Sequence, residues 1–170
     1  NKGDGVYTIT ISGLEHSTNY QWVIEVSDEE DITTKELSFM TEELPFDPFD
    51  EGWQYRKKIT IDHTNVADDL DYFPVLVSTF DTDIRDKAQV DGDDILFMNN
   101  VGVAKKLYHE IEHYDDSSGE LVAWVNIPDV SSDEDTIFYM FYGNPICSNQ
   151  QLPEKVWESN YKAVFHMNEA

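Results

Sequence analysis

Residues 108–128 read YHEIEHYDDSSGELVAWVNIP, and this stretch decides between two incompatible folds. Its opening residues, from His109 to His113, match the H-E-x-x-H signature of zinc metalloproteases, which requires a helix. Its second half, from Glu120 to Pro128, is an apolar run of strand length that ends at a proline. Between the halves stands DDSSG, a cluster of residues typical of turns. The stretch therefore predicts a β-hairpin.

A hairpin is incompatible with the zinc site that the motif suggests. On a helix, two histidines four residues apart are separated by about 6 Å on one face and can share a metal. On a strand the same spacing separates them by about 13 Å, whereas zinc needs both nitrogens about 2 Å away. No further histidine follows the motif until His166. We therefore predict that His109 and His113 lie on a strand and share no metal.

The rest of the chain also predicts β-structure almost throughout. Short helices are expected only at 82–89 and 152–160. Apolar runs of strand length, separated by turn residues, occur on both sides of the hairpin, at 6–11, 20–27, 33–41, 55–62, 72–78, 95–98, 136–143 and 161–167. Many short strands with little helix favour a sandwich over an alternating βα fold.

The composition restricts the partners. The 11 basic and 35 acidic residues give a net charge of −24, which repels nucleic acid and anionic lipid. No apolar run reaches membrane-spanning length, so we expect no membrane insertion by this segment. The single cysteine, Cys147, allows no internal disulfide. The chain opens on Asn1 without a signal peptide, and we therefore expect a piece of a larger protein.

The predicted hairpin gathers aromatic and acidic side chains on one face. If Tyr114 lies near Glu120, the even positions of the first strand share a face with a tryptophan of the second, which groups Tyr108, Glu110, Glu112, Tyr114 and Trp124. Aromatic rings stack on sugars, and carboxylates accept hydrogen bonds from their hydroxyls. These five residues are the predicted glycan-binding platform. The alternative is that they pack beneath a neighbouring strand or loop.

The acidic residues suggest two further kinds of site, a catalytic pair and a calcium site. Glu110 and Glu112 would lie about 7 Å apart on a strand, within the range of inverting glycosidases, but side by side rather than flanking a substrate. We therefore expect no catalytic residues. The turn residues Asp91, Asp93 and Asp94 could hold calcium if their carboxylates converge. No other cofactor is expected.

Six pieces of the chain carry a resemblance to a known family: WQYRKKITI (53–61), FPVLV (73–77), DGDDILF (91–97), HEIE (109–112), AWVNIP (123–128) and DTIFYMFYGN (135–144). Together they resemble the domain of unknown function 2341 family of archaeal and bacterial surface proteins. Before them, GLEHSTNYQWVIEV (13–26) resembles the end of a fibronectin type III or other immunoglobulin-like domain. After them, VWESNYKAVFHMNE (156–169) resembles the entry into a laminin-G-like, concanavalin-type sandwich.

These resemblances imply a domain order. We expect a partial fibronectin type III or immunoglobulin-like domain at 1–44, a linker at 45–52 and a β-sandwich at 53–148. A further linker and the start of a concanavalin-like domain are expected at 149–170. The predicted fold class is all-β, with a jelly-roll-like sandwich preceded by the last strands of an immunoglobulin-like one.

The family resemblance also implies an exported mosaic protein, extracellular or at the cell surface. It supplies no catalytic residues. The function expected first is a non-catalytic structural or adhesive module, in a surface layer or filament. Its partners would be neighbouring domains of the same protein, copies of itself or a glycan. A carbohydrate-binding module of a secreted polysaccharide-acting protein is the second hypothesis, and a glycoside hydrolase is the third.

Overall fold

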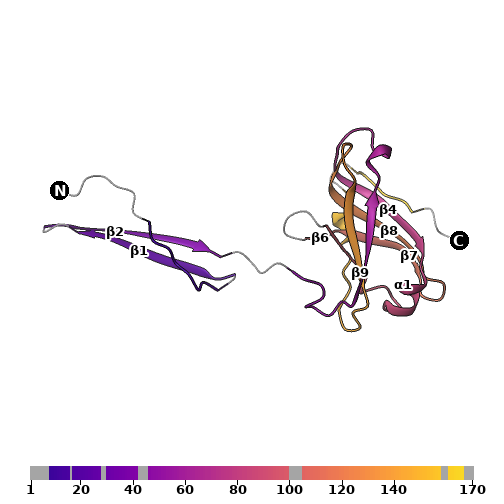
Figure 1. Cartoon of the computed structure of the whole chain (residues 1–170), viewed down its shortest axis with the longest axis horizontal. Helices are drawn as coiled ribbons and strands as arrows, with labels where there is room; N and C mark the ends of the chain where they lie inside the picture. The colour runs from indigo at the N-terminus through magenta and orange to yellow at the C-terminus, as the bar shows by residue number, and fades with distance from the viewer. Residues whose placement is uncertain are drawn as a thin grey trace. The chain divides into compact units, whose positions relative to one another are not determined.

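The computed structural model describes residues 8–15, 17–27, 30–41, 46–99, 105–157 and 161–166. The chain forms two compact units, residues 1–45 and 46–170. The described residues form nine strands, one α-helix and two short 3₁₀-helices (Figure 1). None of these helices has the length and apolar character needed to cross a membrane. The predicted strand at 6–11 is not found, because residues 8–11 lie in no strand. Its first two residues lie outside the described part of the chain.

The first unit contains an antiparallel hairpin of β1 (Asn19–Ser27) and β2 (Ile32–Met40). Its register places Trp22 opposite Leu37. Alternation then puts Trp22, Ile24 and Val26 on one face. These side chains are exposed, with 37% of the surface of Trp22 and 64% of that of Val26 accessible. The hairpin therefore has one apolar face and no core of its own.

An excised peptide of residues 1–44 is expected to be unfolded, because two strands cannot enclose these apolar side chains. Circular dichroism on heating should show no cooperative transition for this peptide. The matched fragment of residues 46–170, which contains a core, should melt cooperatively. A cooperative transition of the 1–44 peptide would contradict this prediction.

The second unit is a sandwich of two antiparallel sheets. One sheet has the order β3-β9-β5-β6, formed by Tyr55–Ile61, Thr136–Tyr142, Leu96–Asn99 and Lys106–Leu107. The other has the order β4-β8-β7, formed by Leu70–Phe80, Glu120–Val130 and His109–Asp115. The prediction of an all-β sandwich is confirmed. The helix α1 (Thr82–Lys87) confirms the short helix expected at 82–89, and the remaining helices are η1 (His63–Asn65) and η2 (Pro153–Lys155).

The main core lies between the two sheets. Alternation along β8 turns Leu121, Ala123 and Val125 inward, and these three side chains are fully buried. They meet Phe97 of β5 and Phe138 of β9 in one cluster. The leucine, valine and phenylalanine side chains of this cluster each contribute about 2 kcal/mol through the removal of apolar surface from water, and Ala123 contributes less. This burial accounts for the alternation of fully and partly buried residues from Glu120 to Val125 of β8.

A second, smaller cluster covers the outer face of the four-stranded sheet. Leu96 and Met98, which alternate with Phe97, pack there with Trp53. Phe46 packs against this cluster, and Pro48, two residues later in the sequence, is also buried. The residues expected to form a linker thus belong, from residue 46 onward, to the second unit.

Candidate functional site

The strand β7 carries the residues of the zinc-like motif. The prediction that His109 and His113 lie on a strand is confirmed. His109 is fully buried against the ring of Phe97, with ring centroids 5.2 Å apart. His113 lies at the surface, where its Nε2 is 3.7 Å from a carboxylate oxygen of Glu120. The two imidazoles therefore lie in different environments, as the strand geometry requires.

A β-bulge between Ile111 and His113 alters the predicted face. Beyond the bulge Tyr114 pairs with Leu121, not with Glu120. Because the extra residue reverses the alternation, Tyr114 turns inward, packs against the core and donates a hydrogen bond to the carbonyl of Ile84 at 3.4 Å. Burial raises the pKa of its phenol to about 12. Contrary to the prediction, Tyr114 therefore lies on the core side of the sheet and not on the face of the glycan platform.

Three of the five predicted platform residues do meet on the outer face of the three-stranded sheet. Glu110 pairs with Trp124 across β7 and β8. The indole nitrogen of Trp124 donates a hydrogen bond to Oε2 of Glu112 at 2.8 Å. Tyr108 lies just before β7 with 46% of its surface exposed. The structure thus brings together Glu110, Glu112 and Trp124 as predicted.

Three residues that no local pattern indicated also contribute to this face: Trp157, Tyr161 and His166. The indole nitrogen of Trp157 donates to Oε2 of Glu110 at 2.8 Å, and its ring lies 5.3 Å from that of Trp124. Tyr161 meets Trp157 edge to face at 5.4 Å. We call these three residues, with Glu110, Glu112 and Trp124, the outer-face cluster.

His166 joins the two acids of the outer-face cluster. Its Nε2 lies 3.3 Å from Oε1 of Glu110, and its Nδ1 lies 3.1 Å from Oε2 of Glu112. Both carboxylates therefore face donors from the chain itself. The outer face of the three-stranded sheet is therefore covered by the C-terminal part of the described chain.

The C-terminal segment already contacts the sandwich at residues that precede its part of the outer-face cluster in the sequence. Val156 is fully buried, and its carbonyl accepts a hydrogen bond from Nδ2 of Asn126 at 2.9 Å. The backbone N–H of Leu152 donates to the carbonyl of His109 at 3.1 Å. The 3₁₀-helix η2 occupies part of the region where a helix was predicted at 152–160; residues 158–160 lie outside the described part of the chain. No local pattern in the sequence could have revealed these contacts, because the partners are more than 25 residues apart.

Two of the three calcium candidates, Asp91 and Asp94, accept hydrogen bonds from different parts of the chain. Asp94 is fully buried, and its carboxylate accepts hydrogen bonds from the backbone N–H groups of Gln89, Gly143 and Asn144 at 2.8, 2.6 and 3.0 Å. Asp91 instead accepts a hydrogen bond from the backbone of Asp93, at 3.2 Å. The buried carboxylate of Asp94 joins two loops and is committed to that structural contact.

Among the described residues, three metal-ligating side chains converge elsewhere, at Asp62, His63 and Asp135, with ligand atoms within 4.8 Å of one another. The ring Nδ1 of His63 lies 2.7 Å from a carboxylate oxygen of Asp135. This contact raises the pKa of His63 and lowers that of Asp135. An ion pair accounts for this exposed arrangement.

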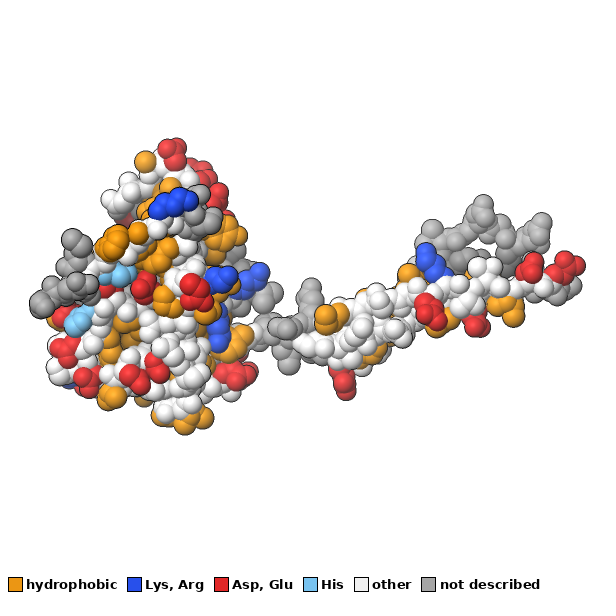
Figure 2. Space-filling model, turned by 180° about the vertical axis from the view of Figure 1, so that it is seen from behind, with side chains coloured by type: hydrophobic (Ala, Val, Ile, Leu, Met, Phe, Trp, Pro, Cys, Tyr) orange, Lys and Arg blue, Asp and Glu red, His pale blue; other side chains and the backbone are white. Residues whose placement is uncertain are grey.

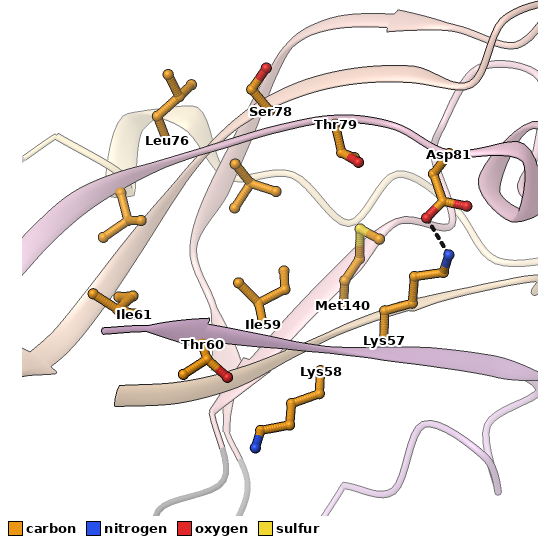
Figure 3. A pocket seen from close by; sticks show the side chains of 12 residues that line it. Lys57, Lys58, Ile59, Thr60, Ile61, Leu76, Ser78, Thr79, Asp81 and Met140 are labelled. Atoms are coloured by element: carbon orange, nitrogen blue, oxygen red, sulfur yellow. Dashed lines mark hydrogen bonds and ion pairs between the residues drawn. The ribbon is translucent and has the colours of Figure 1, made fainter. Parts of the chain in front are cut away.

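A cavity of about 490 Å³ lies between the edge strands β3 and β4 (Figure 3). Ile59 and Met140 give it an apolar floor, and Lys57 forms an ion pair with Asp81 at one end. Lys57 lies on the edge strand β3 with its charge directed inward, which discourages pairing with another strand. The charged end of the cavity therefore has a structural explanation, and we assign no ligand to the cavity.

The fold and the outer-face cluster define a β-sandwich domain whose C-terminal segment packs across one of its sheets. Residues 91–166 match the model of a family described as a domain of unknown function (DUF2341). The match begins at the calcium candidates and ends at His166, so it includes the whole outer-face cluster. No curated protein and no solved structure matches the chain. The match supports the resemblance of the middle domain, and it continues past residue 146 into the docked C-terminal segment.

Proposed function

We propose that this chain is a non-catalytic structural or adhesive part of a protein at the cell surface. The observation that carries the proposal is the engagement of Glu110 and Glu112 by Trp124, Trp157 and His166 of the same chain. Carboxylates that already face donors of their own domain serve packing more readily than ligand binding. The best candidate for a glycan platform thus supports the cohesion of the domain.

The charge of the surface suits this role. Figure 2 shows acidic side chains over much of the visible surface, with hydrophobic side chains between them. A net charge of −24 keeps a protein soluble and favours partners other than nucleic acid. In this proposal the partners are neighbouring domains of the same protein and copies of the chain, outside the cell.

Carbohydrate binding remains the second candidate, because one ring of the outer-face cluster is free to stack on a sugar. Tyr161 is exposed, with 46% of its surface accessible, beside the ring of Trp157. An exposed ring contributes on the order of 1 kcal/mol to stacking, by analogy with aromatic pairs. A single module would therefore bind weakly and would require several copies for avidity.

Glycan-array and titration measurements on the intact chain and on Trp124→Ala distinguish the two candidates. For a structural module we expect no saccharide binding by either protein. Trp124→Ala should also lower the free energy of unfolding by about 2 kcal/mol, because the ring packs against Trp157. The control Trp124→Phe keeps a ring and loses the hydrogen bond to Glu112, so its loss should be smaller. Saccharide binding that disappears in a folded Trp124→Ala protein would instead establish the carbohydrate-binding function.

A further inference from the structure

Lys57 is a charged residue on the inward-facing side of β3. The strand alternates between partly buried and exposed residues, and Lys57 shares its partly buried face with Ile59. Its register partner in β9 is Met140, which is buried. The side chain of Lys57 extends toward Asp81, whereas that of Lys58 points away (Figure 3). The amine of Lys57 is thus held at the open edge of the sandwich.

Two carboxylates meet the amine of Lys57. Its Nζ contacts Oδ2 of Asp81 directly, and Oδ2 of Asp83 lies 3.4 Å from the same nitrogen. The exposed fractions of the side chains are 31% for Lys57, 18% for Asp81 and 52% for Asp83. The contact between Lys57 and Asp81 is therefore largely shielded from water, and Asp83 connects it with the solvent.

The two carboxylate oxygens of Asp81 have different partners. Oδ2 faces the amine, and Oδ1 accepts a hydrogen bond from the backbone N–H of Asp83 at 2.8 Å. A fixed donor on one carboxyl oxygen stabilises the negative charge that develops there when a nucleophile adds to the carbon. The side chain of Asp83 is placed to accept a proton from that nucleophile. The arrangement thus contains a nucleophile, a stabilised carboxyl group and a base, whereas a simple ion pair contains only two charges.

The position of this arrangement in the fold gives a bond there a structural consequence. Lys57 lies on β3, the edge of one sheet, and Asp81 directly follows β4, the edge of the other. Among the described strands, β3 and β4 are not paired with each other. Lys57 and Asp81 are 24 residues apart in the sequence. A covalent bond between them would close a loop that contains β4 and would join the two sheets at their open edge.

We propose that Lys57 and Asp81 condense into an isopeptide bond. Nζ adds to Cγ of Asp81, the Nζ–Cγ bond forms, the Cγ–Oδ2 bond breaks, and Oδ2 leaves as water. The ammonium group keeps one of its three protons, and the other two leave with the water. Asp83 passes a proton from Nζ to Oδ2 and ends unchanged. The bond goes beyond the proposed function and holds for either candidate.

The ionised state of the pair sets the pace of this reaction. Burial acts to lower the pKa of Lys57, but the hydrogen bond with Asp81 and its negative charge outweigh burial and raise that pKa. Because the neutral amine is the nucleophile, condensation requires proton transfer within the pair and follows folding as a slow maturation step. The direct contact favours the step, since effective concentrations in well-oriented pairs reach about 10⁵–10⁸ M.

Mass spectrometry of the intact, denatured chain tests the bond. After folding and incubation, the wild-type chain should be lighter than its sequence by the mass of one water molecule. Trypsin should no longer cut after Lys57, and the digest should contain residues 57–58 attached to residues 59–85 through the side chain of Asp81. Since the wild type itself is measured, this result does not depend on whether any variant folds.

Three variants separate the bond from other losses of water. Lys57→Met removes the nucleophile and should keep the full mass of its sequence. Asp83→Asn removes the base and should slow the loss of water several-fold. The matched control Lys58→Met, on the same strand but directed away from Asp81, should lose water as the wild type does. A wild-type chain that keeps its full mass after a week of incubation, or a loss of water that persists in Lys57→Met, would overturn the proposal.

Discussion

Asp94→Ala is expected to lower the free energy of unfolding of the sandwich by about 4 kcal/mol, the largest loss from any single substitution considered. The carboxylate of Asp94 accepts three backbone hydrogen bonds, from Gln89, Gly143 and Asn144. Alanine would leave these buried N–H groups without acceptors, at about 1–3 kcal/mol each, with partial relief from relaxation. Urea unfolding followed by circular dichroism measures the loss.

Two variants make this result specific. Asp94→Asn keeps the shape of the side chain but has one acceptor oxygen in place of two, so its loss should lie between those of the wild type and alanine. Asp93→Ala removes the neighbouring carboxylate, which accepts none of these hydrogen bonds, and should change stability by less than about 0.5 kcal/mol. A loss below about 1 kcal/mol for Asp94→Ala would refute the structural role assigned to the carboxylate.

The buried His109 is expected to make the sandwich sensitive to acid well before its carboxylates titrate. Burial lowers the pKa of His109 to about 4, although the nearby backbone of Leu107 and Ile95 acts against this shift. The unfolded chain binds this proton with the ordinary pKa of about 6.5. The stability contributed by the neutral ring is therefore complete above about pH 6.5 and is lost as pH falls toward 4. The total loss is about 3 kcal/mol.

A comparison with His109→Leu isolates this effect. Leucine fills a similar volume beside Phe97 and cannot bind a proton, so the pH dependence that His109 causes should disappear. Chemical unfolding of both proteins at pH 7.5, 6, 5 and 4 gives the difference in stability at each pH. This difference should change by about 3 kcal/mol in favour of the variant as the pH falls. Parallel stability curves for the two proteins would contradict the assignment.

The elements of the middle domain could be predicted largely from local pattern. The hairpin of β7 and β8, the strand position of both motif histidines and the grouping of Glu110, Glu112 and Trp124 follow from alternation. The strand expected at 6–11 shows the limit of such arguments, since residues 8–11 form none. An apolar alternation indicates that a segment can form a strand, but a strand also needs a neighbour to complete its hydrogen bonds.

The candidate site was predicted in part, and two of its features depend on more than the local sequence. Tyr114 was misplaced because a bulge after Ile111 reverses the alternation, and the sequence of a strand carries no clear signal for a bulge. Asp94 was considered a calcium ligand because it stands in an acidic turn. Its actual acceptor role depends on Gly143 and Asn144, some 49 and 50 residues away.

By itself, the sequence determined that this chain is all-β, that His109 and His113 cannot lie together on a helix, and which side of β7 bears the glutamates. These properties depend on the two-residue period of a strand and on turn chemistry, which act between near neighbours. Only the tertiary structure decided what covers the glutamates. Trp157 reaches Glu110 across 47 residues, and His166 reaches both acids from farther still. Such contacts depend on how the sheets pack and where the chain returns, and no local period encodes either.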